Sequence, residues 1–188
     1  MTRIIAGRLG GRRLATPPGS GTRPTSDRVR EALFSALEAR LGGLDRLHVL
    51  DLYAGSGALG LEALSRGAEH ATFVEADKRT AGVIRRNARE LGLEDAVTVV
   101  AEKVRAFAER QPPRPYDVIL IDPPYDLPDA DLGAVLAAVT PPAWLDRDGM
   151  VVVERSTRGP DLAWPETVEG ISHRRYGETA LWYGQPHE

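Results

Sequence analysis

The chain has 188 residues, of which 42% are hydrophobic and 27% charged, and it contains no cysteine. This length suits one globular domain, and the lack of cysteine excludes disulfides and thiolate metal sites. No apolar run approaches the roughly 20 residues that span a bilayer, and residues 1–11 lack the pattern of a signal peptide. We therefore expect a cytoplasmic protein without a membrane partner.

Basic residues are concentrated at the start of the chain, although the net charge is −3. The first acidic residue is Asp27. A coding bias toward arginine would explain why lysine is rare, but it would not remove acids from this segment. An arginine-rich segment on a mildly acidic body is typical of a phosphate contact. The candidates for binding nucleic acid are Arg8, Arg12, Arg13 and Arg23.

Residues 1–25 are rich in glycine and proline and predict a short hairpin, Arg3–Ala6 with Arg12–Ala15, followed by a loop. This basic N-terminal extension is too short to have its own core, so it must pack on the rest of the chain or on its ligand. We expect residues 26–188 to form the main domain. It opens with a helix that Thr25 or Ser26 caps, in which apolar residues recur every four positions and which Gly42-Gly43 ends.

Beyond this helix, apolar strands alternate with helices. The strands are predicted at residues 47–53, 71–75, 97–101, 116–121 and 150–154, and the helices at residues 58–66, 78–91, 104–110 and 132–139. Short apolar strands without alternation, separated by helices, indicate a parallel sheet that is buried on both faces. The end of the chain differs, because residues 171–176 and 179–183 flank Gly177 as a β-hairpin. The fold class is therefore α/β and Rossmann-like, with helices on both faces of the sheet.

A glycine-rich turn follows the first predicted strand of the main domain. Gly55 to Gly60 matches the pattern G-x-G-x-x-G, which lets a backbone turn sharply and approach a ligand. The match alone also fits a dinucleotide site or a turn without any ligand. Asp51, at the end of the strand, favours a cationic amino acid moiety over a pyrophosphate. These features point to S-adenosylmethionine.

The next strand ends in Glu75, where a carboxylate suits the two ribose hydroxyls of an adenosine cofactor. Asp77 is the rival for this role, and Glu75 has the better position at the strand end. The predicted contacts of the cofactor are Asp51, Tyr53, Ala54, Gly55, Gly57, Glu75 and Val104.

The segment Asp122-Pro123-Pro124-Tyr125 follows the fourth strand and is the second chemical signal. Two prolines fix the backbone and remove two N–H donors. We therefore expect the carbonyls nearby to stay clear of ordinary turn hydrogen bonds. Such a segment presents acceptors to a planar amine.

An exocyclic base amine is a poor nucleophile, because its lone pair is delocalised into the ring. Hydrogen bonds from its two N–H groups to the Asp122 carboxylate and the Pro123 carbonyl would align the nitrogen with a methyl donor. Tyr125 would stack on the base, which would first be turned out of any helix. Asp122, Pro123, Pro124 and Tyr125 are the predicted catalytic residues.

With these motifs, the sequence resembles the RsmD-type 16S ribosomal RNA guanine-N2 methyltransferases over almost its whole length. The similarity includes residues 3–14, 23–34, 51–64, 122–125 and 176–179. The resemblance implies a seven-stranded sheet whose last strand is antiparallel, S-adenosylmethionine as cofactor, and methylation of N2 of one guanine. The implied partner is 16S rRNA in an assembled or partly assembled small ribosomal subunit.

The chain departs from this family after the third strand. Many relatives carry Asp or Asn there, which can bond the adenine amine, whereas this chain has Lys103. Lysine cannot accept that hydrogen bond. We expect adenine to rely on the Val104 backbone N–H and on apolar contact.

Other functions stay open on the residues alone. Adenine N6 and a protein glutamine amide are equally planar amines, and the glycine pattern also fits an NAD-dependent dehydrogenase. A non-catalytic RNA-binding assembly factor is a further alternative. The histidines show no metal-ligand spacing, so we expect no metal, and we expect the protein to be a monomer.

Overall fold

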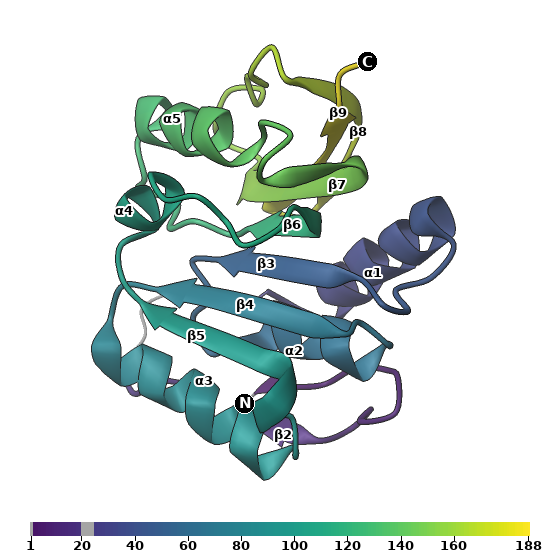
Figure 1. Cartoon of the computed structure of the whole chain (residues 1–188), viewed down its shortest axis with the longest axis vertical. Helices are drawn as coiled ribbons and strands as arrows, with labels where there is room; N and C mark the ends of the chain where they lie inside the picture. Colours follow the sequence, from purple (N-terminus) through teal and green to yellow (C-terminus); the bar gives the residue numbers. More distant parts are fainter. Residues whose placement is uncertain (1, 20–24) are drawn as a thin grey trace.

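The computed structural model describes residues 2–19 and 25–188, and its centre is a seven-stranded sheet (Figure 1). The strand order is β5-β4-β3-β6-β7-β9-β8. All pairs are parallel except those of β9, which runs antiparallel to both β7 and β8. This confirms the expected parallel sheet with a C-terminal antiparallel hairpin. The strands are β3 (His48–Leu52), β4 (His70–Glu75), β5 (Val97–Ala101), β6 (Tyr116–Ile121), β7 (Leu145–Ser156), β8 (Val168–Tyr176) and β9 (Thr179–Pro186).

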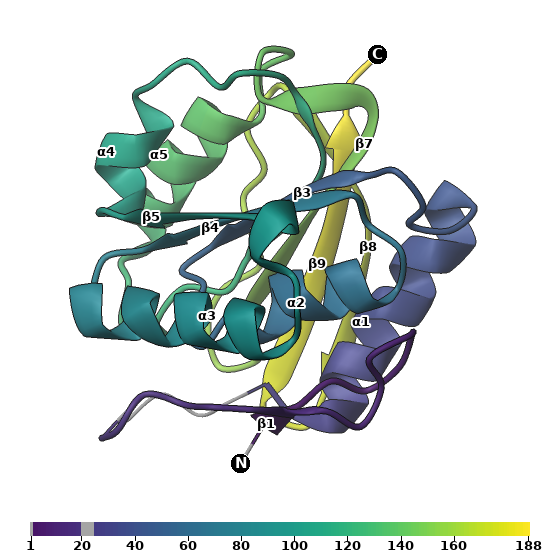
Figure 2. The ribbon, with the colours of Figure 1, turned by 60° about the horizontal axis from the view of Figure 1, so that its bottom comes forward.

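Helices cover both faces of the sheet (Figure 2). On β3, Val49 belongs to the core cluster shared with the first three helices, and the next residue, Leu50, belongs to the cluster shared with the last two. Successive residues thus point to opposite buried faces, as the uninterrupted apolar strands predict. One layer contains α1 (Asp27–Leu41), α2 (Ala58–Ser65) and α3 (Lys78–Glu90), and the other contains α4 (Val104–Ala108) and α5 (Asp129–Val139), with a 3-10 turn at Glu94–Ala96.

The helix boundaries follow local signals. The Ser26 hydroxyl accepts the Val29 N–H at 3.2 Å and caps α1, and Gly42 ends the same helix at φ 75°. The sequence predicted Thr25 or Ser26 as the cap and Gly42-Gly43 as the end, and the structure selects Ser26 and Gly42. Among the described residues, no helix is both long and apolar enough to cross a bilayer.

Strand β7 is longer than its apolar stretch predicts. It begins at Leu145, which pairs with Tyr116 of β6, and its far end pairs with β9 as far as Ser156. The polar residues before Met150 show no strand pattern, and they lie at a shift in the register between β6 and β7. The backbones are close there, because a Cβ at Gly149 would lie 2.8 Å from the Asp117 carbonyl oxygen. The pair of Leu145 with Tyr116 begins β7, and residues 146–149 form the irregularity between this pair and the next, Met150 with Val118.

The N-terminal extension packs on the main domain, as its length requires. Its two strands, β1 (Thr2–Arg3) and β2 (Arg13–Leu14), are antiparallel and shorter than the predicted hairpin. Ile4 is buried in the core cluster of the first helical layer. The buried Glu62 carboxylate on α2 accepts the N–H groups of Ile5 and Ala6 at 2.8 and 3.0 Å. Polar side chains of the main domain therefore anchor the extension.

Candidate active site

The carboxyl ends of β3, β4, β6 and β7 lie along one edge of the sheet, the side to which their arrowheads point in Figure 1. The chain progresses outward from β3 in one direction through β4 and β5, and in the other through β6 and β7. Ligands of open α/β sheets bind at such a reversal. The glycine-rich turn and the Asp122–Tyr125 segment follow the neighbouring strands β3 and β6, and the Asp122 N–H contacts the Leu52 carbonyl at 3.5 Å.

Each glycine of the turn meets a different requirement. A Cβ at Gly60 would lie 2.3 Å from the Phe73 ring, and one at Gly57 would lie 3.1 Å from Ile84. These two glycines let α2 pack closely on the sheet. Gly55 has φ +57°, and a Cβ there would meet nothing within 4 Å. Tyr53, half-buried at the strand end, also has a positive φ of 60°, which is unusual for a side chain of this size.

Glu75 lies beside the glycine-rich turn. Its carboxylate accepts the Gly55 N–H at 2.9 Å and the Asp77 N–H at 3.1 Å. Asp77 instead caps α3 by accepting the Thr80 N–H at 2.8 Å. The structure therefore places Glu75, and not its rival, beside the open space at Gly55. Each carboxylate oxygen retains a further lone pair for a ligand.

Asp51 lies beneath the turn and is only 1% exposed. Its carboxyl accepts the Gly60 N–H of the first turn of α2 at 3.0 Å, a contact that the N-cap residue Gly57 has no side chain to make. Burial raises the pKa of Asp51 to about 8, the Gly60 hydrogen bond opposes the shift, and Glu75 adds to it. Asp51 thus supports the turn from within, and its contact with a cofactor stays a prediction.

The loop after β5 lies next to the end of β4, near the glycine-rich turn. Val104 is buried as the first residue of α4, while Lys103 before it is exposed. Among the described residues, none accepts a hydrogen bond from the Val104 N–H. The Glu102 N–H donates to the Glu75 carbonyl at 3.1 Å, which fixes this loop next to the turn.

The Asp122–Tyr125 segment changes from half-buried to exposed along its length. Asp122 is half-buried, Pro123 is buried, and Tyr125 is 46% exposed, with its hydroxyl 3.4 Å from the Thr179 hydroxyl. Among the described residues, none donates a hydrogen bond to the Pro123 carbonyl, which agrees with its expected role. An exposed ring beside a free acceptor suits a base that enters from solvent.

The prediction that neighbouring carbonyls avoid turn hydrogen bonds is wrong for Pro124. Its carbonyl accepts the Leu127 N–H at 3.0 Å and the Arg155 guanidinium at 3.2 Å. Arg155, on β7, also donates to the Leu127 carbonyl at 3.0 Å and the Asp129 carboxylate at 3.1 Å. The prolines remove donors from the segment itself, but Leu127, three residues after Pro124, and the distant Arg155 supply them. Arg155 thus fastens the loop after the motif to the sheet.

Sequence reasoning also missed Thr25 and Glu154, which meet Asp122. The Thr25 hydroxyl lies 2.9 Å from a Glu154 carboxyl oxygen and 3.3 Å from an Asp122 carboxyl oxygen. Ile121 is in register with Val153, so the two acids follow paired residues on neighbouring strands. Glu154 carried a signal, because it ends the predicted apolar strand at residues 150–154 just as Glu75 ends the one at residues 71–75. Thr25 carried none.

The predicted nucleic-acid contacts lie elsewhere. The Arg8 N–H donates to the carbonyl of Ser65, the last residue of α2, and the Arg12 guanidinium donates to that of Glu90, the last residue of α3, both at 2.9 Å. Helices that follow parallel strands run back toward the amino edge, so these two arginines lie away from Asp122. Arg13 is exposed on β2, and Arg23 lies outside the described residues.

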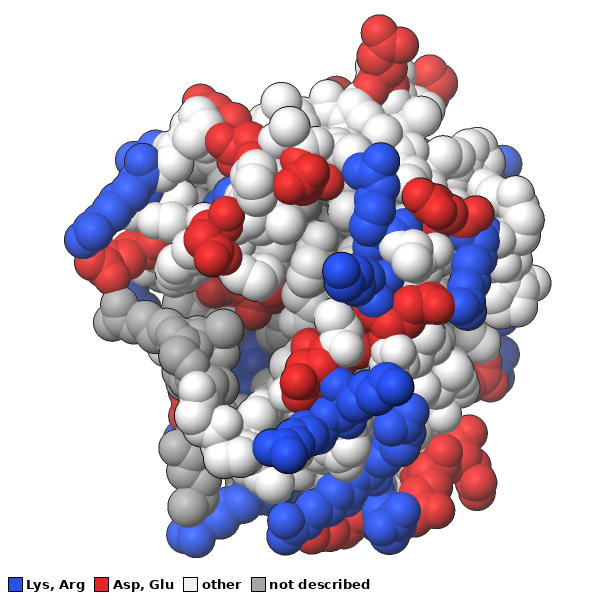
Figure 3. Space-filling view, turned by 90° about the vertical axis from the view of Figure 1, so that its left-hand side faces the viewer, with Lys and Arg blue, Asp and Glu red and all other residues white. Residues whose placement is uncertain are grey.

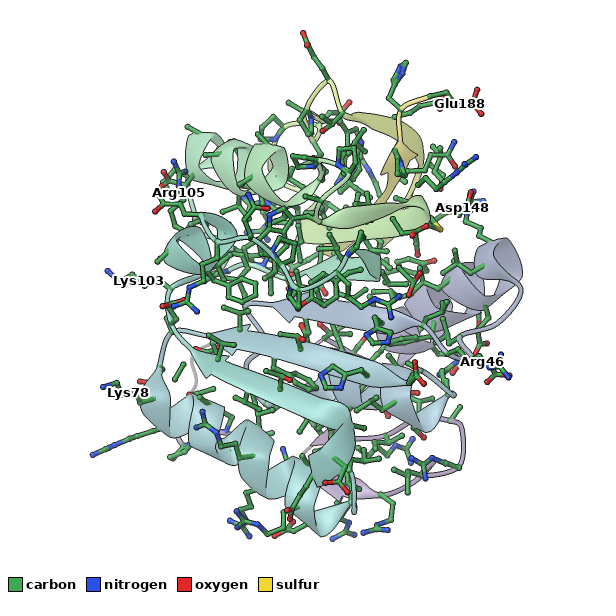
Figure 4. The ribbon with its side chains drawn as sticks, viewed as in Figure 1. Arg46, Lys78, Lys103, Arg105, Asp148 and Glu188 are labelled. Atoms are coloured by element: carbon green, nitrogen blue, oxygen red, sulfur yellow. The ribbon has the colours of Figure 1, made fainter. Side chains whose placement is uncertain are left out.

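Other cations lie at the carboxyl edge itself. Lys78, Lys103 and Arg105 are exposed and project from this side of the molecule (Figure 4). The view onto this side shows basic side chains at its centre and in its lower part, with acidic side chains between them and at the upper left (Figure 3). The edge that contains Asp122 therefore has exposed cations that the N-terminal pattern did not reveal.

Comparison with known proteins agrees with this architecture. The family model described as "Conserved hypothetical protein 95" matches residues 2–185. Ribosomal RNA small subunit methyltransferase D of Haemophilus influenzae is 35% identical over 177 residues, which cover 93% of this chain and 89% of the relative. The solved structure of yhhF from Escherichia coli has a TM-score of 0.85 at 30% identity and covers 98% of this chain and 97% of its own.

The fold extends to more distant enzymes. Magnesium protoporphyrin IX methyltransferase from Synechocystis PCC 6803, solved with bound SAM, is 14% identical, with a TM-score of 0.67, covering 85% of this chain and 79% of its own. The Rossmann-like sheet is therefore that of a class I methyltransferase. Together with the family model and the full-length relative, it shows that the chain belongs to the RsmD-type methyltransferase family.

Proposed function

We propose that this protein transfers a methyl group from S-adenosylmethionine to the exocyclic N2 amine of a guanine in 16S rRNA of the small ribosomal subunit. The observation that carries the proposal is the meeting, on neighbouring strands, of the open turn at Gly55 and the acceptor-bearing Asp122–Tyr125 segment. The name of the Haemophilus influenzae relative supports ribosomal RNA as substrate. We further propose that the protein is a cytoplasmic monomer that acts on an assembled or partly assembled subunit.

The residues at the turn fit the cofactor. Gly55 leaves the space that a close backbone approach requires, and the Glu75 carboxylate beside it has acceptor capacity for ribose hydroxyls. Tyr53, Ala54 and Val104 would line the same cofactor site. When bound, S-adenosylmethionine supplies an electrophilic methyl group attached to a positively charged sulfur.

The Asp122–Tyr125 segment would orient the target. The Asp122 carboxylate and the Pro123 carbonyl would accept the two amine hydrogens, and the exposed Tyr125 ring would stack on the base. The nitrogen lone pair would form a bond to the methyl carbon as that carbon's bond to sulfur breaks and the sulfur becomes neutral. The nitrogen would then give up a proton, which the Asp122 carboxylate would accept. Acceptors held in place before the reaction stabilise the positive charge that develops on nitrogen.

Small subunits from a strain that lacks this gene provide the test. They would be incubated with the protein and labelled S-adenosylmethionine, and the rRNA digested to nucleosides for mass analysis. We expect the label in N2-methylguanosine at one position. Label in N6-methyladenosine or in protein glutamine would replace this proposal with one of the other planar amines. The absence of both label and cofactor binding would favour a dehydrogenase or an assembly factor.

The glycine-rich turn offers a matched pair of substitutions. Gly55→Ala should weaken S-adenosylmethionine binding, because the new Cβ enters the open space of the turn. Its cost in the free energy of unfolding should stay at about 1–2 kcal/mol, from the left-handed backbone. Gly60→Ala should cost about 1–3 kcal/mol, because its Cβ collides with Phe73. Urea unfolding and calorimetric titration measure both; unchanged affinity in Gly55→Ala would remove the turn from the cofactor site.

Two surfaces are proposed to contact RNA phosphates: Arg8, Arg12, Arg13 and Arg23 on the N-terminal extension, and Lys78, Lys103 and Arg105 at the carboxyl edge. A ribosomal particle is much larger than this chain, so it can reach both edges. Each lost phosphate contact flattens the dependence of log K on log salt by about 0.7–0.9.

Neutralising Arg12 and Arg13 together should weaken RNA binding and flatten that slope by about 1.4–1.8. The double variant Lys103→Ala/Arg105→Ala should do the same and serves as the comparison at the site itself. Filter binding from 50 to 300 mM salt gives both slopes. If the slope of the Arg12/Arg13 variant equals that of the wild type, those arginines are only a solvated surface.

A further inference from the structure

We propose that Thr25 and Glu154 are positioning residues that orient the Asp122 carboxyl and set the pH range in which it accepts the target amine. The inference rests on the proposed function and deepens it. Thr25 immediately precedes the cap of α1, and Glu154 lies on β7, so two distant parts of the chain meet the motif residue.

The number of hydrogens at this contact is informative. A threonine hydroxyl has one hydrogen to donate, yet the Thr25 oxygen lies within hydrogen-bond distance of both the Glu154 and the Asp122 carboxyl oxygens, at 2.9 and 3.3 Å. Two ionised carboxylates cannot both be satisfied by that one hydrogen. The three groups complete both hydrogen bonds only when one carboxyl is itself protonated. The contact with Glu154 is the shorter of the two and is therefore the stronger hydrogen bond of the Thr25 hydroxyl.

The surroundings favour a single shared negative charge. Glu154 is 5% exposed, and among the described residues no Lys, Arg or His forms an ion pair with either acid. A third acid, Asp51, lies near Asp122 on β3. Burial raises the pKa of Asp122 well above its ordinary value; Glu154 and then Asp51 raise it further, and the Thr25 hydrogen bond opposes the rise. Burial also raises the pKa of Glu154.

This arrangement has a direct consequence for the reaction. Asp122 must be ionised to accept a hydrogen from the amine and to offset the charge that develops on nitrogen. Asp122 gives up the shared proton as the pH rises through its pKa, and it then carries a negative charge beside that of Glu154, with the Thr25 hydroxyl 3.3 Å from one of its oxygens. The other oxygen of Asp122 is then available to the substrate. Activity is therefore present above the pKa of Asp122 and is lost as the pH falls through it.

The two neighbours act on that pKa in opposite directions, which gives a sharp test. Glu154→Gln removes a nearby negative charge, so Asp122 should ionise more easily and the acid limb of the kcat–pH profile should move to lower pH. Thr25→Val removes a donor to the carboxylate, so the acid limb should move to higher pH. We expect each shift to be about one pH unit. Thr25→Ser, which restores the hydroxyl, should return the limb toward its wild-type position.

The test has a control and a second readout. Asp126→Asn neutralises an exposed carboxyl in the same loop and should leave the profile in place. Titrating the carboxyl ¹³C signal of Asp122 by NMR in the full-length variants measures the same shifts without any turnover, and thermal unfolding confirms that each variant is folded. The inference is overturned if the active wild type and both variants titrate at the same pH, or if both variants shift in the same direction. Failure of the proposed function looks different: the wild type itself would methylate no small subunit at any pH.

Discussion

Replacing Asp122 by alanine should lower methyl transfer by about 10²–10³-fold or more, while S-adenosylmethionine binds with unchanged affinity. Asp122 belongs to the predicted amine site at the end of β6, whereas the turn at Gly55 is supported by Asp51 and Glu75. Its removal also relieves repulsion among buried acids, so the variant should unfold at no lower temperature than the wild type. Loss of activity without loss of stability is typical of a residue selected for function.

Single-turnover methylation of small subunits and calorimetric cofactor titration give the two quantities. Asp126→Ala is the matched control, because it removes an exposed carboxyl from the same loop and should keep full activity. Near wild-type turnover of the Asp122→Ala variant would remove this carboxylate from the mechanism. A parallel loss of cofactor affinity would instead assign Asp122 to the cofactor site.

Replacing Glu62 by alanine should lower the free energy of unfolding by about 2–4 kcal/mol. The Glu62 side chain is fully buried and accepts three hydrogen bonds, from the N–H groups of Ile5 and Ala6 and from the Arg66 guanidinium. Alanine would leave two backbone donors without their acceptor. Arg66 would keep Glu31 and Glu38, so the cost should stay below that of a fully unpaired buried cation.

Urea unfolding at neutral pH measures this change, and limited proteolysis tests whether the N-terminal extension is released first. Glu90→Ala is the control, because Glu90 forms an exposed ion pair with Arg86 one helical turn away and should cost less than about 1 kcal/mol. Equal costs for the two variants would mean that Glu62 does not anchor the extension.

Much of the fold was accessible from local patterns. Strands such as residues 116–121 could be predicted from their uninterrupted apolar residues, because both faces of a parallel sheet are buried. Ser26 begins α1 through its hydroxyl and Gly42 ends it through its left-handed backbone, and both effects act within four residues. The start of β7 could not be predicted, since Leu145 pairs with Tyr116 across an irregularity at residues 146–149, whose polar side chains solvent would accept equally well.

The candidate site also contains some features that local sequence patterns predicted and others that they did not. Gly55, Glu75 and Asp122 stand at the ends of recognisable strands, and parallel strands bring their carboxyl ends to one edge. Arg155 was invisible to this reasoning, because its three acceptors depend on how the loop after Pro124 folds back. The arginines of the extension were recognised as a group, yet their pattern did not reveal that Arg8 and Arg12 lie at the ends of α2 and α3.

The sequence by itself determined the class of sheet, the order of its strands and helices along the chain, and the two motifs that stand at its carboxyl edge. These features depend on periodicity and on backbone chemistry that a few neighbouring residues set. Only the tertiary structure decided that Thr25 joins Asp122 and Glu154, residues 97 and 129 positions away in the chain. A hydroxyl between a buried and a half-buried carboxyl has no local signature, because its energy arises only when packing brings all three groups together away from most of the water.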